Sequence, residues 1–135
     1  MIDGVAVRPG RGARALFAVV LAVQLVVLYW PRAVQPPSGG LPWDKLVHAL
    51  VFGAVYWAGV RAGVPWRAWL AVSLAHAPVS ELLQHAVLPN RRGDAGDAIA
   101  DAAGVLLAWA LTAYLTRRAG DGPRHPADGA RVARE

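Results

Sequence analysis

The stretch SELLQHAVLPNRRGDAGDAIADAAG, residues 80–104, places a dense set of ionisable side chains between two apolar runs. A charged side chain at or inside a bilayer boundary costs several kcal/mol of free energy unless it is paired, hydrated or part of a functional site. The acids fall on two expected helix ends that a short loop brings together. This stretch therefore predicts a helical hairpin in an apolar environment, and it is the segment that best fits a functional site.

The composition supports an apolar environment for the whole chain. The 135 residues correspond to one domain, of which 56% are hydrophobic, and the mean hydropathy of +0.34 is too high for an ordinary soluble domain of this size. There is no cysteine, which excludes a disulfide framework and a thiolate metal site. The net charge of +5 could indicate nucleic-acid binding. The arginines lie in the tails and short loops, however, so we expect a topology signal and no nucleic-acid partner.

Four apolar runs predict four membrane helices, at residues 15–30, 46–64, 66–88 and 98–116. A helix needs about 20 apolar residues to cross a hydrocarbon core of about 30 Å. The very short connection before Pro65 predicts an antiparallel hairpin, with Pro65 starting the third helix. The first run has a basic lead like a signal peptide, but the residues after it lack a small-x-small cleavage site, so we expect it to be retained.

The expected fold is therefore all-α, an antiparallel bundle of four transmembrane helices in a polytopic membrane protein. The membrane domain covers residues 14–116. The flanking segments 1–13 and 117–135 are rich in Gly, Pro, Ala and Arg without an apolar period, and we expect disordered cytoplasmic tails there.

The basic residues orient the predicted bundle. With both termini in the cytoplasm, ten basic residues fall inside: Arg8, Arg11, Arg14, Arg61, Arg67, Arg117, Arg118, Arg124, Arg131 and Arg134. Four fall outside: Arg32, Lys45, Arg91 and Arg92. This asymmetry follows the positive-inside rule and predicts a multi-pass protein of the plasma membrane.

Two of the predicted helices carry polar stripes. On the third, Ser73, His76, Ser80 and Gln84 lie within about 80° of one another, with Glu81 about 60° further on. Pro78 lies within this stripe and should kink the helix. Lipid cannot satisfy these hydrogen bonds, so the stripe should face the bundle interior.

The fourth predicted helix has a matching stripe of Asp97, Asp101, Gly104 and Ala108. The two small residues permit a close helix contact. Asp97 can be explained as a capping acid in the first turn, but Asp101 lies one turn further in, where capping no longer accounts for it.

Asp44, Lys45 and His48 open the second predicted helix and can meet on one flank, because they are spaced by three and four residues. His48 is either a buried hydrogen-bonding residue or a functional one, and its depth matches that of Glu81, Gln84 and Asp101. Arg91, in the loop after the third helix, either neutralises the acids around it or binds an anionic group through its planar guanidinium.

Taken together, Asp44-Lys45-x-x-His48, Glu81-x-x-Gln84, Pro89-x-Arg91, Asp97 and Gly104 resemble the VanZ-like family of small bacterial membrane proteins. The resemblance covers about residues 40–115. Asp101 departs from it, since the family often has asparagine at this position. The resemblance implies a polytopic protein of the cell envelope, and the namesake of the family is associated with resistance to teicoplanin, a lipid-tailed glycopeptide.

Three functions stay open from the sequence: binding of an amphiphilic envelope ligand, with membrane lipid as the other partner; an acid–base or metal-dependent enzyme acting on a lipid-linked envelope substrate; or a structural or accessory membrane subunit. The sequence does not decide whether the protein is an enzyme. We assign no cofactor and no metal, although histidines with carboxylates make a plausible divalent-metal set. The candidate catalytic residues are Glu81, Asp97, Asp101 and His48. The candidate ligand-binding residues are Asp44, Lys45, His48, Glu81, Gln84, Arg91, Asp97 and Asp101.

Overall fold

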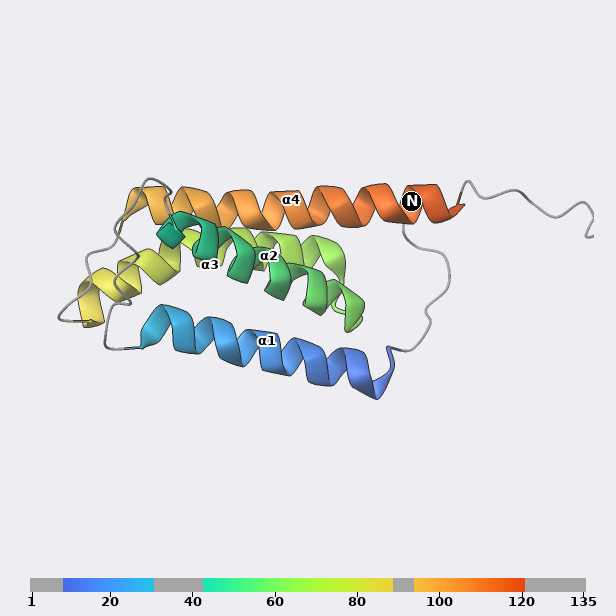
Figure 1. Cartoon of the computed structure of the whole chain (residues 1–135), viewed down its shortest axis with the longest axis horizontal. Helices are drawn as coiled ribbons and strands as arrows, with labels where there is room; N and C mark the ends of the chain where they lie inside the picture. Colours follow the sequence, from blue (N-terminus) through green and yellow to red (C-terminus); the bar gives the residue numbers. More distant parts are fainter. Residues whose placement is uncertain (1–8, 31–42, 89–93, 121–135) are drawn as a thin grey trace, which may run out of the picture.

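The structure, a computed structural model, describes residues 9–30, 43–88 and 94–120. They form four helices: α1 (Arg11–Tyr29), α2 (Trp43–Arg61), α3 (Trp66–Val87) and α4 (Ala95–Gly120). Consecutive helices run in opposite directions, so the end of α1, the start of α2, the end of α3 and the start of α4 share one end of the bundle (Figure 1). The prediction of an all-α four-helix bundle is confirmed.

Two of the four helices, α1 and α4, are long and apolar enough to cross a membrane. Among the described residues, α2 and α3 are not apolar enough to count as spans by themselves, although the sequence predicts four spans. The physical reason lies in their polar residues, because α2 begins with Asp44 and Lys45 and α3 carries the stripe from Ser73 to Gln84.

The helix ends differ from the expected ones by a few residues. α1 begins at Arg11, and α4 begins at Ala95 and continues past Thr116 to Gly120. Asp94 caps the start of α4, because its Oδ1 accepts a hydrogen bond from the Gly96 backbone N–H at 2.7 Å. Arg117 and Arg118 lie in the last turn of α4, where cations are stabilised by the helix dipole.

A tight turn joins α2 to α3, as the short connection predicts. Gly63 has a φ of +88°, and the Val64 N–H donates to the Gly59 carbonyl at 3.0 Å while the Gly63 N–H donates to Val60 at 3.1 Å. This is a Schellman arrangement, which needs the left-handed backbone conformation that glycine adopts without strain. Pro65 caps α3, whose ribbon changes direction in the half that contains Pro78 (Figure 1).

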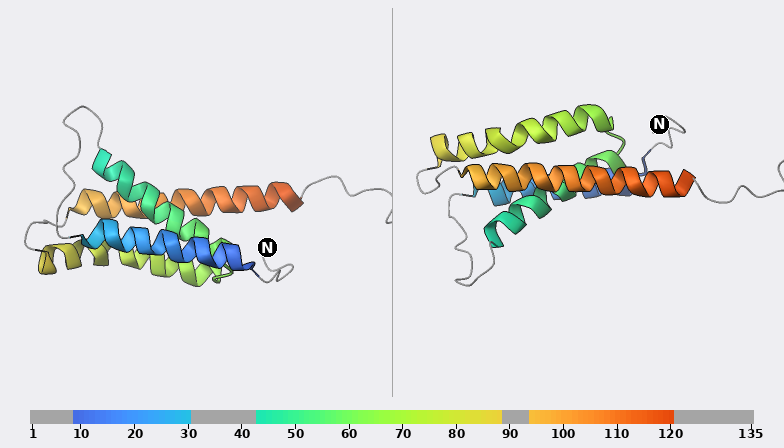
Figure 2. Two further views of the ribbon diagram at one scale, coloured as in Figure 1. Left: turned by 60° about the horizontal axis from the view of Figure 1, so that its bottom comes forward. Right: turned by 90° about the horizontal axis from the view of Figure 1, so that it is seen from above.

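α2 packs most extensively against α4, which it crosses at a contact between glycines (Figure 2). A Cβ on Gly104 would collide with the backbone carbonyl of Ala49, and a Cβ on Gly53 would lie 2.9 Å from the Gly104 carbonyl oxygen. Ala108 completes the contact on α4. The predicted small-residue contact at Gly104 and Ala108 is therefore confirmed, with Gly53 as its counterpart on α2.

Polar side chains are buried while large apolar side chains are exposed. Asp101 and Ser80 have no exposed surface, and Gln84 is 3% exposed. In contrast, Leu107 and Ile99 on α4 are each 70% exposed. All four helices present large apolar side chains on the outside, which reverses the arrangement of a typical soluble protein.

Candidate functional site

His48 lies at the centre of a group of carboxylates contributed by two other helices. Its Nδ1 lies 2.9 Å from Oδ1 of Asp101 on α4, and both side chains are buried. Glu81 on α3 approaches the same ring, with Oε1 at 4.0 Å from Nδ1. Asp97 approaches from α4, with Oδ2 at 3.9 Å from Nε2. We call His48, Glu81, Asp97 and Asp101 the carboxylate–histidine cluster.

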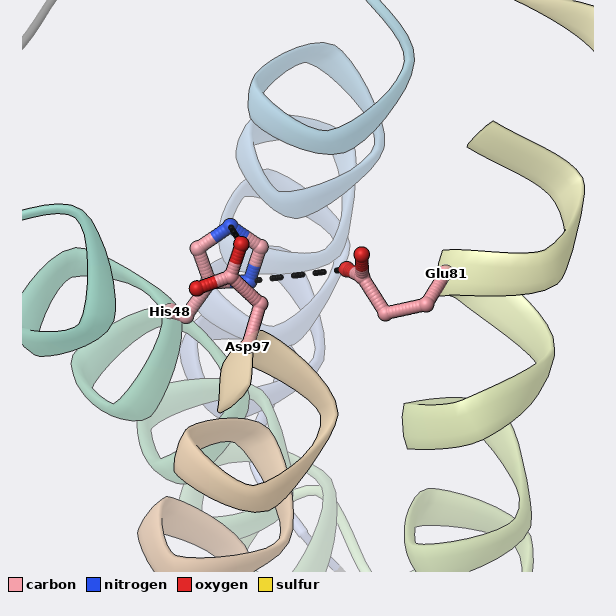
Figure 3. A group of neighbouring side chains, drawn as sticks. All are labelled: His48, Glu81 and Asp97. Atoms are coloured by element: carbon pink, nitrogen blue, oxygen red, sulfur yellow. Dashed lines mark ion pairs between the residues drawn. The ribbon is translucent and has the colours of Figure 1, made fainter. Parts of the chain in front are cut away.

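Figure 3 shows the Glu81 and Asp97 carboxyl groups pointing toward the His48 ring from separate helices. One donor atom from each of these three residues lies within 4.8 Å of the other two. The distances from His48 to Glu81 and Asp97 exceed the range of a direct hydrogen bond, whereas the His48–Asp101 distance lies within it. The ring is therefore held on one side by Asp101 and faces Asp97 with its other nitrogen.

Glu81 connects the end of α3 to the start of α4. Its Oε2 accepts a hydrogen bond from the Asp94 backbone N–H at 3.0 Å, and its Oε1 accepts one from Gln84 Nε2 at 3.1 Å. Only 6% of Glu81 is exposed. The bond from Asp94 holds the carboxylate against the N-terminus of α4, where negative charge is favoured, and the bond from Gln84 fixes it from its own helix.

Lys45 joins the start of α2 to the start of α4 at the rim of the cluster. Its ammonium donates hydrogen bonds to Asp97 Oδ1 and Asp94 Oδ2, each at 2.9 Å, and pairs with Asp44 at 3.5 Å. The hydrogen bond from Lys45 lowers the pKa of Asp94, which also caps α4.

One atom of the cluster has no hydrogen-bond partner among the described residues. Asp101 Oδ2 is buried and unpaired, while Oδ1 of the same carboxyl group binds His48. A buried acceptor left without a partner costs about 1–3 kcal/mol. Asp101 therefore holds an acceptor for which the described side chains supply no donor.

The structure brings together most of the residues expected at the site. His48, Glu81, Gln84, Asp97, Asp101 and Lys45 lie within one connected set of contacts. Asp44 is exposed and pairs with Lys45 at the edge, rather than turning to His48. Arg91 lies outside the described residues, as do 1–8, 31–42 and 121–135. The prediction of disordered tails is wrong where the tails are described as helix, at 11–13 in α1 and 117–120 in α4. That the expected site residues bind a ligand stays a prediction.

Two residues with a structural role at or near the site are not among the expected ones. Asp94 accepts from Lys45 and caps α4, and the Asp-x-Gly pattern before an apolar helix is a recognisable cap signal. Gln24 on α1 is 2% exposed and lines a small pocket with Ser73 and His76. A lone glutamine in the apolar run of α1 carries no signal of which neighbour it meets.

His76 and Ser80 do not form a catalytic pair. His76 Nε2 lies 3.4 Å from the Tyr29 hydroxyl and its ring stacks on Phe52, while the Ser80 hydroxyl donates to the Ala77 carbonyl of its own helix. The carboxylate–histidine cluster can instead bind a cation, transfer protons or accept hydrogen bonds from a polar ligand.

Comparison with known protein families, with curated proteins and with solved structures finds no match for this chain. The resemblance to the VanZ-like family therefore stays a prediction from the motif residues.

Proposed function

We propose that this chain is an integral membrane protein whose four helices all cross the bilayer and whose carboxylate–histidine cluster binds the polar head of an amphiphilic envelope ligand. The observation that carries the proposal is the position of the cluster. It is a buried polar site assembled from three helices at one end of a bundle with an apolar exterior.

The apolar exterior supports four spans, although only α1 and α4 have the hydropathy of a span by themselves. The residues that lower the hydropathy of α3 are turned inward, with Ser73, Ser80, Glu81 and Gln84 all buried. The outer surface of α3 presents Val72, Leu82 and Val87 instead. A helix of this kind meets lipid with its apolar face while its polar face binds its neighbours.

The basic residues favour an outward-facing cluster in this proposal. Arg61, Arg67 and Arg118 lie at the opposite end of the bundle, which the positive-inside rule assigns to the cytoplasm. Both termini are then cytoplasmic, and the cluster faces the cell exterior at the level of the lipid headgroups.

The carboxylates suit the cationic or hydrogen-bond-donating groups of a ligand head, while the exposed apolar helix faces suit its acyl tail. The VanZ-like resemblance supports an envelope ligand of this kind, since the namesake of the family is associated with resistance to a lipid-tailed glycopeptide. Arg91 is the candidate for an anionic group of the ligand.

A second candidate function is a metal-dependent or acid–base enzyme acting on a lipid-linked envelope substrate. The observation that favours it is the convergence of His48, Glu81 and Asp97, whose donor atoms lie within 4.8 Å of one another. The two functions share one site and differ in whether a bond of the bound molecule is broken.

The test is protection of a glycopeptide-sensitive bacterium that expresses the chain. We expect the inhibitory concentration of teicoplanin to rise several-fold, with no change for a glycopeptide that lacks an acyl tail. Glu81→Gln keeps the shape of the side chain but removes its charge, and should abolish the protection. His85→Gln changes an exposed histidine on the same helix end and should leave it intact.

Immunoblots of isolated membranes provide the control for protein amount. Full protection by Glu81→Gln at wild-type abundance would contradict a role for the cluster. Equal protection against tailed and tail-free glycopeptides would contradict recognition of an amphiphile.

A further inference from the structure

We propose that His48, Glu81 and Asp97 bind a divalent transition-metal ion, with Asp101 as the positioning residue behind His48. The sequence interpretation assigns no metal, and the inference comes from the geometry of the cluster. It does not depend on the identity of the amphiphilic ligand.

The first observation is the spacing of the three donors. His48 Nε2 and Asp97 Oδ2 lie 3.9 Å apart, too far for a hydrogen bond, and one donor atom from each of the three residues lies within 4.8 Å of the other two. Two ligand atoms that share one ion at about 2.1 Å each lie roughly 3–4 Å apart. Small rotations of the two carboxylates bring the three residues onto one ion.

The second observation is the hydrogen bond behind the histidine. Histidines that bind metals almost always donate their other ring N–H to a carboxylate or carbonyl group, which fixes the tautomer. Asp101 Oδ1 lies 2.9 Å from His48 Nδ1, and this bond leaves the Nε2 lone pair directed at Asp97. The arrangement is a carboxylate–histidine pair whose free nitrogen faces Asp97, with the Glu81 carboxylate beside the ring.

The third observation is independent of the distances among these donors. Asp101 is completely buried and its Oδ2 has no hydrogen-bond partner among the described residues. Asp101 lies one helical turn beyond Asp97 on the same face of α4 and contacts the ring at the centre of the cluster. An unpaired, fully buried carboxylate oxygen directly behind the ring adds negative charge next to His48 and fits a site built to hold positive charge.

The charge of the described residues points the same way. Lys45 pairs with Asp44, Asp94 and Asp97, whereas the carboxylates of Glu81 and Asp101 lie beside His48. Among the described residues, Lys45 donates hydrogen bonds to Asp94 and Asp97, and Glu81 accepts them from the Asp94 N–H and Gln84. Asp101 has only His48 as a partner there and depends on it or on a bound cation for compensation. A divalent ion supplies it at a point that all three helices share.

The donor types select the class of metal. One imidazole nitrogen with two carboxylates suits Zn²⁺ or Mn²⁺ better than Mg²⁺ or Ca²⁺, which prefer oxygen ligands alone. Three protein ligands leave a coordination position open for water or for a group of the bound molecule.

The experiment uses the full chain purified in detergent, stripped with a chelator, and titrated with Zn²⁺ and Mn²⁺ by calorimetry. We expect one ion per chain, and no detectable binding for His48→Gln, Glu81→Gln or Asp97→Asn. The controls are His85→Gln and Arg118→Gln, which change an exposed histidine and an exposed arginine outside the cluster and should bind like the wild type. Circular dichroism and gel filtration show which variants remain folded.

Asp101 provides a graded readout of its positioning role. Asp101→Asn keeps an acceptor for the His48 N–H and should weaken binding about 10-fold, whereas Asp101→Ala should weaken it about 100-fold. Rescue by asparagine distinguishes orientation of the ring from general loss of packing.

X-ray absorption of the zinc-loaded wild type tests the ligand set without any substitution. The expected first shell contains one imidazole nitrogen and carboxylate oxygens. Failure of the folded wild type to bind either ion, equal loss of binding in the controls, or a shell without imidazole would overturn the proposal. Because no amphiphile is present, this outcome is distinct from failure of the resistance assay.

Discussion

The two ends of the bundle carry charges of opposite sign, and one end buries them while the other exposes them. At one end, the carboxylate–histidine cluster buries its charged groups between α2, α3 and α4. At the other end, Arg61, Arg67 and Arg118 are exposed, and each lies 5.1–5.6 Å from the ring of a neighbouring aromatic residue.

This difference separates charge that suits a lipid headgroup region from charge that is gathered in a candidate site. At the arginine end, Arg61, Arg67 and Arg118 each lie near one ring no more than four positions away in the sequence, an arrangement that suits a headgroup region. The cluster end has contacts between residues 33 to 53 positions apart. The candidate site is therefore distinguished by buried groups that converge from distant segments, and not by charge alone.

The largest effect expected from this comparison is that the two ends of the bundle are accessible from opposite sides of the membrane. The chain has no cysteine, so single cysteines can be introduced at Asn90 and at Gly120, which belong to opposite ends of the predicted bundle. In intact cells an impermeant thiol reagent should label the Asn90→Cys protein fully and the Gly120→Cys protein only after lysis. The reverse pattern would place the cluster in the cytoplasm.

Gly104→Ala should produce the next largest effect, because the added Cβ would meet the Ala49 backbone below the cluster. We expect a loss of about 3 kcal/mol in the free energy of unfolding, from overpacking against a backbone that cannot rotate away. Gly120→Ala is the control, since nothing lies within 4 Å of its new Cβ.

The measurement is the helical signal in detergent against increasing denaturant. Similar stability of the Gly104 and Gly120 variants would mean that the crossing of α2 and α4 can relax, and that the cluster geometry does not depend on it.

The smallest effect concerns Asp94 at the rim. Its hydrogen bond with Lys45 lowers the pKa of the Asp94 carboxyl group in the folded protein. The contribution of Asp94 to stability is therefore present above the ordinary aspartate pKa of about 3.9, and it is lost as the pH falls through the lowered value. Asp94→Asn keeps the helix cap and removes the charge. The melting temperatures of wild type and variant should therefore differ at pH 7 and converge in acid. A difference that grows in acid would contradict this role of Asp94.

The inward-facing polar residues were predictable because apolar surroundings leave them few alternatives. Ser73, Ser80 and Gln84 are buried as the helical spacing predicts, and Asp101 is buried one turn beyond the reach of a cap. These predictions need only a helix period and a solvent that cannot form hydrogen bonds.

The partners of these residues were less predictable, since they depend on how α2 crosses α4. The spacing of Asp44, Lys45 and His48 predicts contacts along one helix, whereas Lys45 and His48 reach instead to Asp97 and Asp101. The crossing is set by Gly53 and Gly104, and the pattern of one helix does not reveal the glycine that faces it on another.

The dispersal of the cluster over α2, α3 and α4 has a consequence for biogenesis. In the four-span arrangement, α2 and α3 leave the insertion machinery before α4, when His48 and Glu81 lack their partners on α4, and they have less hydropathy than α1. Their partners Asp97, Asp101 and the Asp94 amide arrive only with the last helix. In that arrangement, the hairpin of α2 and α3 is stabilised only after α4 is inserted. We therefore expect a chain truncated before α4 to be released or degraded rather than to accumulate as a partial bundle.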